Sequence, residues 1–124
     1  MRFKIDTKEK IVIFRPEIQV LDANLSEEFV RQITQLPELE GRNLILDMEL
    51  VESADEAGIQ AILTVYGQQY DSNLSCAIAN LNNTLTAALH KDSEYELNIT
   101  PTLSEAIDMV MMESLERDLL DEEE

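Results

Sequence analysis

Three acidic residues flank a short loop of the 124-residue chain, between residues 47 and 56, whereas the acidic residues as a whole are most frequent near the C-terminal end. Asp47 ends a short apolar run, and Asp55 and Glu56 stand just before a helical pattern. Carboxylates that converge on a substrate with shifted pKa values can perform general acid/base catalysis. The three residues therefore define one hypothesis, an enzyme that acts on a small molecule or an anion. The alternative for Asp47 is a hydrogen bond to the loop that follows it.

The sequence lacks the patterns of several other kinds of site. Its three glycines stand far apart, which argues against a glycine-rich phosphate loop, and one histidine with one cysteine cannot build a zinc site. Cys76 alternates with Leu74 and Ile78, a pattern that predicts a buried thiol instead of a nucleophile. His90 closes a helical pattern, where a histidine usually interacts with the helix dipole. We therefore expect no cofactor and no metal.

The carboxylates must be positioned by the elements on either side of them. Residues 44–48 form an apolar run, which is typical of a strand buried on both faces. The residues from 56 onward carry one apolar stripe at helical spacing, so they predict an amphipathic helix. Together these elements form the first half of a β-α-β unit. The residues of the stripe are Ile59, Ile62, Leu63, Tyr66 and Tyr70.

The start of this helix carries two candidate caps. Ser53 and Glu56 have the spacing of a capping box, whereas Asp55 could cap the helix alone. Gly58 lies one turn into the helix, where glycine costs about 1 kcal/mol relative to alanine. We expect that another backbone segment approaches Gly58 closely, and a merely tolerated glycine is the alternative.

The whole chain predicts an α/β fold. The order of elements is β-β-α-β-α-β-α-β-α, which implies a mixed sheet of four or five strands with about four helices packed over it. Residues 44–48 are expected at the centre of the sheet and residues 3–8 at an edge, where lysines discourage association. Asn24 and Glu27 have capping-box spacing at the first helix. Further strands are expected at residues 11–14, 74–79 and near 97–99, and helices at residues 25–36, 81–90 and from 102 onward.

Charge and composition narrow the class of partner. The net charge is −17, from 26 acidic and 9 basic residues, so binding to nucleic acid or to an anionic membrane surface is disfavoured. We expect no membrane span and no secretory signal. A single cysteine fits a reducing compartment, and we expect a cytoplasmic protein. We also expect a single domain over residues 1–116 and an acidic tail over residues 117–124.

Residues 47–59 resemble the central motif of the STAS domain, the family of bacterial anti-sigma-factor antagonists and of the cytoplasmic tails of sulfate transporters. The family's motif reads Asp-Leu-Ser, then four or five variable residues with a central valine, then Asp-Ser-Ser-Gly-Leu. The chain keeps Asp47, Val51, Asp55 and Gly58, and Ile59 stands in place of the leucine. The order of elements also agrees with the STAS fold over nearly the whole chain.

The resemblance departs from the family at the two serines, which are replaced by Glu56 and Ala57. In the family a partner kinase phosphorylates the second serine, and Ala57 has no hydroxyl to modify. Pro16 also stands where the family has the glycine of a neighbouring loop. The resemblance thus implies a module that is not phosphorylated at the usual position, with Ala57 as the equivalent residue.

By this resemblance, the chain is a non-enzymatic protein-interaction module similar to an anti-sigma-factor antagonist in a partner-switching pathway. Its expected partner is an anti-sigma factor or a related kinase-like protein, with a homodimer as a further possibility. The resemblance places the contact surface at the start of the central helix and in the loop before the first helix. The expected contact residues are Glu17, Gln19, Asp22, Ser53, Asp55, Glu56, Ala57 and Gly58.

Overall fold

The computed structural model describes residues 1–123, and Glu124 lies outside the described residues. Its elements are, in chain order, β1 (Phe3–Thr7), β2 (Ile11–Pro16), β3 (Val20–Leu21), α1 (Ala23–Thr34), the short 3-10 helix η1 (Pro37–Leu39), β4 (Asn43–Asp47), β5 (Ser53–Ala54), α2 (Glu56–Asp71), β6 (Cys76–Ala79), α3 (Asn83–Asp92), β7 (Ile99–Thr100) and α4 (Leu103–Glu123). Five strands form one mixed sheet in the order β1-β2-β4-β6-β7, and β3 pairs with β5 in a separate two-stranded sheet. β1 runs antiparallel to β2, and the other neighbours in the main sheet are parallel.

The main sheet confirms the expected α/β fold, with β4 at its centre and β1 at an edge. All five residues of β4 are buried, because helices cover both faces of the sheet at this strand. Leu44 and Leu46 point into the core on one face, whereas Ile45 points into the core on the other. This arrangement explains the continuous apolar run, since a strand buried on both faces needs no polar alternation.

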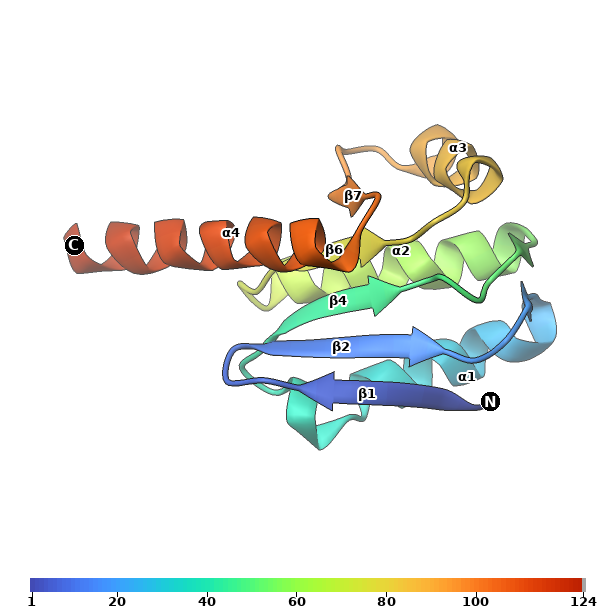
Figure 1. The fold of residues 1–124 in the computed structure, drawn as a ribbon, viewed down its shortest axis with the longest axis horizontal. Helices are drawn as coiled ribbons and strands as arrows, with labels where there is room; N and C mark the ends of the chain where they lie inside the picture. The colour runs from blue at the N-terminus through green and yellow to red at the C-terminus, as the bar shows by residue number, and fades with distance from the viewer. Residues whose placement is uncertain (124) are drawn as a thin grey trace.

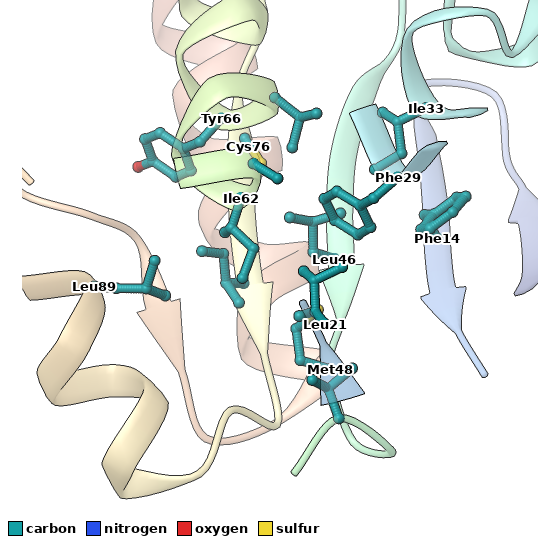
Figure 2. Close-up of a cluster of buried hydrophobic side chains, with 14 of the residues drawn as sticks. Phe14, Leu21, Phe29, Ile33, Leu46, Met48, Ile62, Tyr66, Cys76 and Leu89 are labelled. Atoms are coloured by element: carbon teal, nitrogen blue, oxygen red, sulfur yellow. The ribbon is translucent and has the colours of Figure 1, made fainter. Parts of the chain in front are cut away.

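Helices α1 and α2 pack on one face of the sheet, and α4 packs on the other (Figure 1). The larger core lies under α1 and α2, where Phe14 of β2 meets Phe29 of α1 edge-on (Figure 2). Phe14 also stacks on Phe3 of β1. The ring centroids of the two pairs are 6.0 Å and 4.7 Å apart, which are favourable spacings for aromatic pairs. The smaller core joins Ile45 of β4 to Ala106 of α4.

Helix α4 extends beyond the sheet (Figure 1). Val110 is buried against the sheet, whereas Met112, Leu115 and Leu119 further along the helix are exposed. The helix runs to Glu123, so residues 117–123 of the expected acidic tail continue it. The expected domain boundary at residue 116 stays a prediction. No helix in residues 1–123, the 21-residue α4 included, is long and apolar enough to cross a membrane.

The start of α1 differs from the expected one. Asp22 caps the helix, since its carboxylate accepts a hydrogen bond from the N–H of Asn24 at 3.0 Å. Asn24 therefore lies inside the helix and does not cap it. The two residues before Asp22 form β3, and Asp22 itself keeps the extended backbone that a cap requires.

Cys76 in β6 is fully buried, as its alternation with Leu74 and Ile78 predicted. Burial raises the pKa of the thiol, and the carboxylate of Glu113 raises it further. We expect a thiol reagent to modify native Cys76 at least about 1,000-fold more slowly than the unfolded chain, because the reaction must wait for the fold to open. Labelling followed by absorbance, with and without urea, would measure the two rates. Comparable rates would contradict the burial of this thiol.

Candidate functional site

The small sheet of β3 and β5 joins two loops that are far apart in the sequence. The two strands pair in parallel, which places the loop before α1 against the loop before α2. The carbonyl of Gln19 accepts hydrogen bonds from the N–H groups of Glu52 and Ser53, at 2.7 and 3.1 Å. The side-chain amide of Asn82, the cap of α3, donates to the carbonyl of Glu52 at 2.8 Å. The starts of three helices are therefore tied to one backbone segment.

Asp55 links the starts of two of these helices. Its Oδ1 accepts a hydrogen bond from the N–H of Gly58 at 2.9 Å and so caps α2. Its Oδ2 accepts a hydrogen bond from the N–H of Ala23, the first residue of α1, at 3.0 Å. The N–H of Asp55 donates in turn to the carbonyl of Leu21 at 3.2 Å. Asp55 is therefore the cap, and the alternative in which Ser53 caps the helix is wrong.

Replacing Asp55 with alanine is expected to lower the free energy of unfolding by about 2 kcal/mol, because the starts of α1 and α2 lose an acceptor together. Replacing Asp22 with alanine removes the single bond to Asn24 and is expected to cost about 1 kcal/mol. Urea unfolding followed by circular dichroism would compare both variants with the wild type. Equal losses would contradict the double role of Asp55.

Gly58 is required by the close packing of backbone. A Cβ atom at this position would lie 2.1 Å from the carbonyl oxygen of Leu21 and 3.1 Å from the Cβ of Ala54. Both neighbours belong to the small sheet, so they cannot move aside without disturbing its pairing. The expected close approach of backbone is thus confirmed. Gly58 is buried and has no side chain, so a partner protein could not contact it directly.

The structure gathers most of the expected contact residues at the end of the molecule where α1 and α2 begin. Glu17 is turned away from the others, because its N–H donates to the carbonyl of Arg2 and its carboxylate reaches Lys4 at 4.0 Å. The others lie in or beside the small sheet and the first turn of α2. Gln19, Ser53, Asp55 and Glu56 are exposed, Glu17, Asp22 and Ala57 are half-buried, and Gly58 is buried.

Two exposed apolar side chains in the loops before α1 and α2 were not among the expected contact residues. Val20 is 47% exposed and Leu50 is 38% exposed. Val20 lies opposite Ser53 in the small sheet, and Leu50 lies in the loop between β4 and β5. Apolar side chains rimmed by polar ones are common at protein interfaces. Periodicity could not reveal Val20, because a strand of two residues is too short to show any alternation.

A groove between α1 and α2 adjoins Ala57. It has a volume of about 460 Å³, and Ala57 lines it together with Ala61 from the next turn of α2. Glu27 and Arg31 of α1 line its other side. Because Ala57 is half-buried in the wall of an open groove, a longer side chain at this position would be accessible from outside.

The three carboxylates of the enzyme hypothesis have separate surroundings. Asp47 is buried, and its carboxylate accepts hydrogen bonds from the N–H of Glu49 at 3.2 Å and from the side-chain amide of Asn80 at 3.0 Å. Asp55 caps α2, and Glu56 is exposed on the first turn. The structural role considered for Asp47 is confirmed. In the part of the chain that the structure describes, no group of three His, Cys, Asp or Glu side chains could hold a metal ion.

A model of the STAS domain matches residues 2–106, which is most of the chain. Because the match covers well over half of its residues, the chain belongs to the STAS domain family. A search of curated protein sequences finds no match for it.

Three solved structures illustrate the range of proteins that share the fold. A Thermotoga maritima protein assigned as an anti-sigma factor antagonist has a TM-score of 0.76 at 20% identity, over 88% of this chain and 94% of its own. A serine-to-glutamate variant of RsbS from Moorella thermoacetica has a TM-score of 0.69 at 17% identity, over 94% and 99%. The murine anion transporter Slc26a9 has a TM-score of 0.69 at 17% identity, over 82% of this chain and 18% of the transporter. Identities this low establish the shared fold alone.

Proposed function

We propose that this chain is a non-enzymatic protein-interaction module of a partner-switching pathway. Its contact surface lies at the start of α2 and comprises Gln19, Val20, Ser53, Glu56 and Ala57, which we call the α2-start surface. The observation that carries the proposal is that the small sheet and the helix caps hold two loops rigidly beneath exposed side chains. A surface that is already ordered loses little conformational entropy on binding, which favours recognition of a protein.

The proposed partner is an anti-sigma factor or a related kinase-like protein, by analogy with the antagonists that share the fold. The net charge of −17 supports a protein partner over nucleic acid or an anionic membrane. Basic residues of the partner would face Glu56, and apolar residues would face Val20. Such a partner places the protein in the cytoplasm. Self-association is a further prediction, which sedimentation of the purified chain would test.

We further infer that the module stays in its partner-binding state. In the family, the hydroxyl at the position of Ala57 accepts a phosphate and the partner is released. Here Ala57 presents a methyl group, and the hydroxyl of Ser53 lies in β5, before the cap of α2. Glu56 carries one negative charge, less than the charge of about −1.5 to −2 on a phosphate at pH 7, and it suits the positive end of the helix dipole.

A reversal of charge at Glu56 tests the α2-start surface. Glu56→Lys is expected to weaken binding of the cognate anti-sigma-type kinase at least about tenfold, because like charges then face each other across the contact. Glu105→Lys is the matched control, since Glu105 is also an exposed acidic residue in the first turn of a helix, α4. Isothermal titration calorimetry would give both Kd values, and melting curves would verify folding. Unchanged affinity of Glu56→Lys would place the interface elsewhere.

A further inference from the structure

All three tyrosines of the chain meet in one pocket, with Tyr66 and Tyr70 coming from α2 and Tyr95 from the segment before β7. The ring centroids of Tyr66 and Tyr70 are 5.2 Å apart, and those of Tyr66 and Tyr95 are 5.9 Å apart. The pocket has a volume of about 480 Å³ and lies between the second half of α2, the segment before β7, and α4. Tyr70 and Tyr95 are 37% and 51% exposed, so their rings are accessible to a ligand.

The wall of this tyrosine pocket is acidic. Asp71, Glu96 and Glu113 line it, and its other lining residues are the three tyrosines, Gly67 and Asn98. The wall therefore holds no lysine, arginine or histidine. Throughout residues 1–123, none of these three carboxylates forms an ion pair with a basic group of the chain. A cation that enters the pocket would meet negative charges that have no ion-pair partner within the described chain.

Glu113 is held in its ionised form mainly by neutral hydrogen-bond donors. The hydroxyl of Tyr70 donates to its Oε1 at 2.7 Å, and the side-chain amide of Asn98 donates to its Oε2 at 3.0 Å. Burial raises the pKa of Glu113, but hydrogen bonds from neutral side chains, helped by the charge of Arg117, outweigh burial and hold the pKa below its ordinary value. Burial also raises the pKa of Tyr66 to about 12, so this ring stays neutral at pH 7. The pocket thus combines fixed negative charge with neutral aromatic rings.

We propose that the tyrosine pocket binds a guanidinium group, carried by a small molecule or by an arginine side chain. A guanidinium ion is flat and weakly hydrated, so it stacks on aromatic rings, and its N–H groups pair with carboxylates in a fork. An ammonium ion has the same charge but lacks the flat face and the fork. The residues of α2 that line the pocket, from Tyr66 to Asp71, lie about 14–21 Å along the helix from Ala57, given a rise of about 1.5 Å per residue. The proposal therefore does not rest on the proposed function.

Tyrosine fluorescence reports on this pocket alone, because all three tyrosines line it and the chain has no tryptophan. Agmatine and putrescine are matched ligands: both are dications on a four-carbon stem, and they differ in one guanidinium group. At low ionic strength, where exposed charges are little screened, we expect agmatine to half-saturate the signal at about 1 mM. Putrescine is expected to bind at least about fivefold more weakly.

A third ligand, acetyl-arginine-amide, distinguishes the two sources of the guanidinium group. Acetyl-lysine-amide is its matched comparison, because both compounds carry one positive charge. If acetyl-arginine-amide binds at least about fivefold more tightly than acetyl-lysine-amide, the site suits an arginine side chain in a polypeptide. If the two bind equally, while agmatine still binds more tightly than putrescine, the site suits a free small molecule. Either result supports the proposal, and a wild-type protein that responds to none of these ligands would overturn it.

Two double variants test whether the acidic wall contributes to binding. Asp71→Asn with Glu96→Gln removes two charges that line the pocket and is expected to weaken agmatine binding about fivefold or more. Asp6→Asn with Glu9→Gln is the matched control, because it removes the same charge at the opposite edge of the sheet. The control is expected to bind agmatine as the wild type does. Equal weakening in the two double variants would show a general charge effect and overturn the proposal.

Gly67→Gln tests the pocket without removing a charge. A Cβ atom at Gly67 would lie 3.4 Å from the hydroxyl oxygen of Tyr95, an ordinary contact, so a longer side chain can extend into the pocket. Glutamine also suits a helix better than glycine, so the variant is expected to fold. We expect it to lose the agmatine response. A saturable response that persists in Gly67→Gln, or equal affinities for agmatine and putrescine in the wild type, would overturn the proposal.

Discussion

Replacing Gly58 with alanine is expected to lower the free energy of unfolding by about 3 kcal/mol, although alanine normally stabilises a helix. The added Cβ would lie 2.1 Å from the carbonyl oxygen of Leu21, far inside contact distance. That oxygen belongs to β3 and also accepts the N–H of Asp55, so relief requires the small sheet to separate from α2. Urea unfolding followed by circular dichroism would measure the change.

Gly67→Ala is the matched control, because Gly67 lies in the same helix. Its added Cβ would lie 3.4 Å from the hydroxyl oxygen of Tyr95, so the helix gains alanine's preference at little steric cost. We expect the free energy of unfolding to rise by about 0.5–1 kcal/mol. The two glycine-to-alanine changes should therefore have opposite signs. A loss of stability at both positions, or at neither, would contradict the role given to the Leu21 carbonyl.

The steric clash at Gly58 limits which variants can test the α2-start surface. A large residue at Gly58 would clash with the backbone of β3 and separate the two joined loops. Loss of a partner in such a variant would report a folding defect, and the interface would remain untested. Glu56 is exposed, and within residues 1–123 its side chain forms no hydrogen bond or ion pair with the rest of the chain. Substitutions at Glu56 therefore address binding.

Local patterns were sufficient to predict the elements at the centre of the fold. The apolar residues 44–46 form the middle of β4 (Asn43–Asp47), because burial on both faces of the sheet favours apolar side chains there. Ile59, Ile62 and Tyr66 of the predicted helical stripe are buried in α2, whereas Leu63 is half-buried and Tyr70 is exposed. Gly58 was also interpretable from its position, since a helix-interior glycine is costly unless the fold requires it.

The choice between neighbouring caps could not be predicted, because tertiary contacts decide it. Ser53 and Asp55 both have side chains that can cap a helix. Asp55 is the cap because its second oxygen also reaches the N–H of Ala23, which is distant in sequence. Ser53 pairs in β5 instead, and a two-residue strand leaves no periodic signal.

The tyrosine pocket was equally hidden in the sequence. Helical spacing predicts that Tyr66 and Tyr70 belong to the apolar stripe of α2, and this prediction is correct for Tyr66, which is buried. Tyr95 comes from the segment between α3 and β7, and Glu113 comes from α4. The parallel pairing of β6 with β7 and the packing of α4 bring these residues together.

The function proposed for the α2-start surface, in contrast, depends on a motif resemblance.

Introducing a hydroxyl at position 57 is expected to restore control by phosphorylation. Ala57→Ser costs about 0.5 kcal/mol of helix stability, and the adjoining groove leaves the new side chain accessible. With the cognate kinase and ATP, we expect one phosphate, which adds a charge of about −1.5 to −2 beside Asp55 and Glu56. We expect affinity for the partner to fall about 100-fold, through repulsion and desolvation at the contact. Phosphopeptide mass spectrometry and calorimetry would measure the two effects.

The double variant Ser53→Ala with Ala57→Ser assigns the phosphate to its residue. The small sheet uses the backbone N–H of Ser53, so loss of the hydroxyl leaves this pairing intact. Wild-type protein from its own cells is expected to carry no phosphate at Ser53. Stoichiometric phosphate there would show that the permanent binding state is wrong, and an unmodified Ala57→Ser variant would argue against a kinase partner. Serine and alanine differ by one oxygen atom. If the loss of partner binding requires both ATP and the Ala57→Ser change, the absence of control by phosphorylation in the wild type is explained by that missing atom.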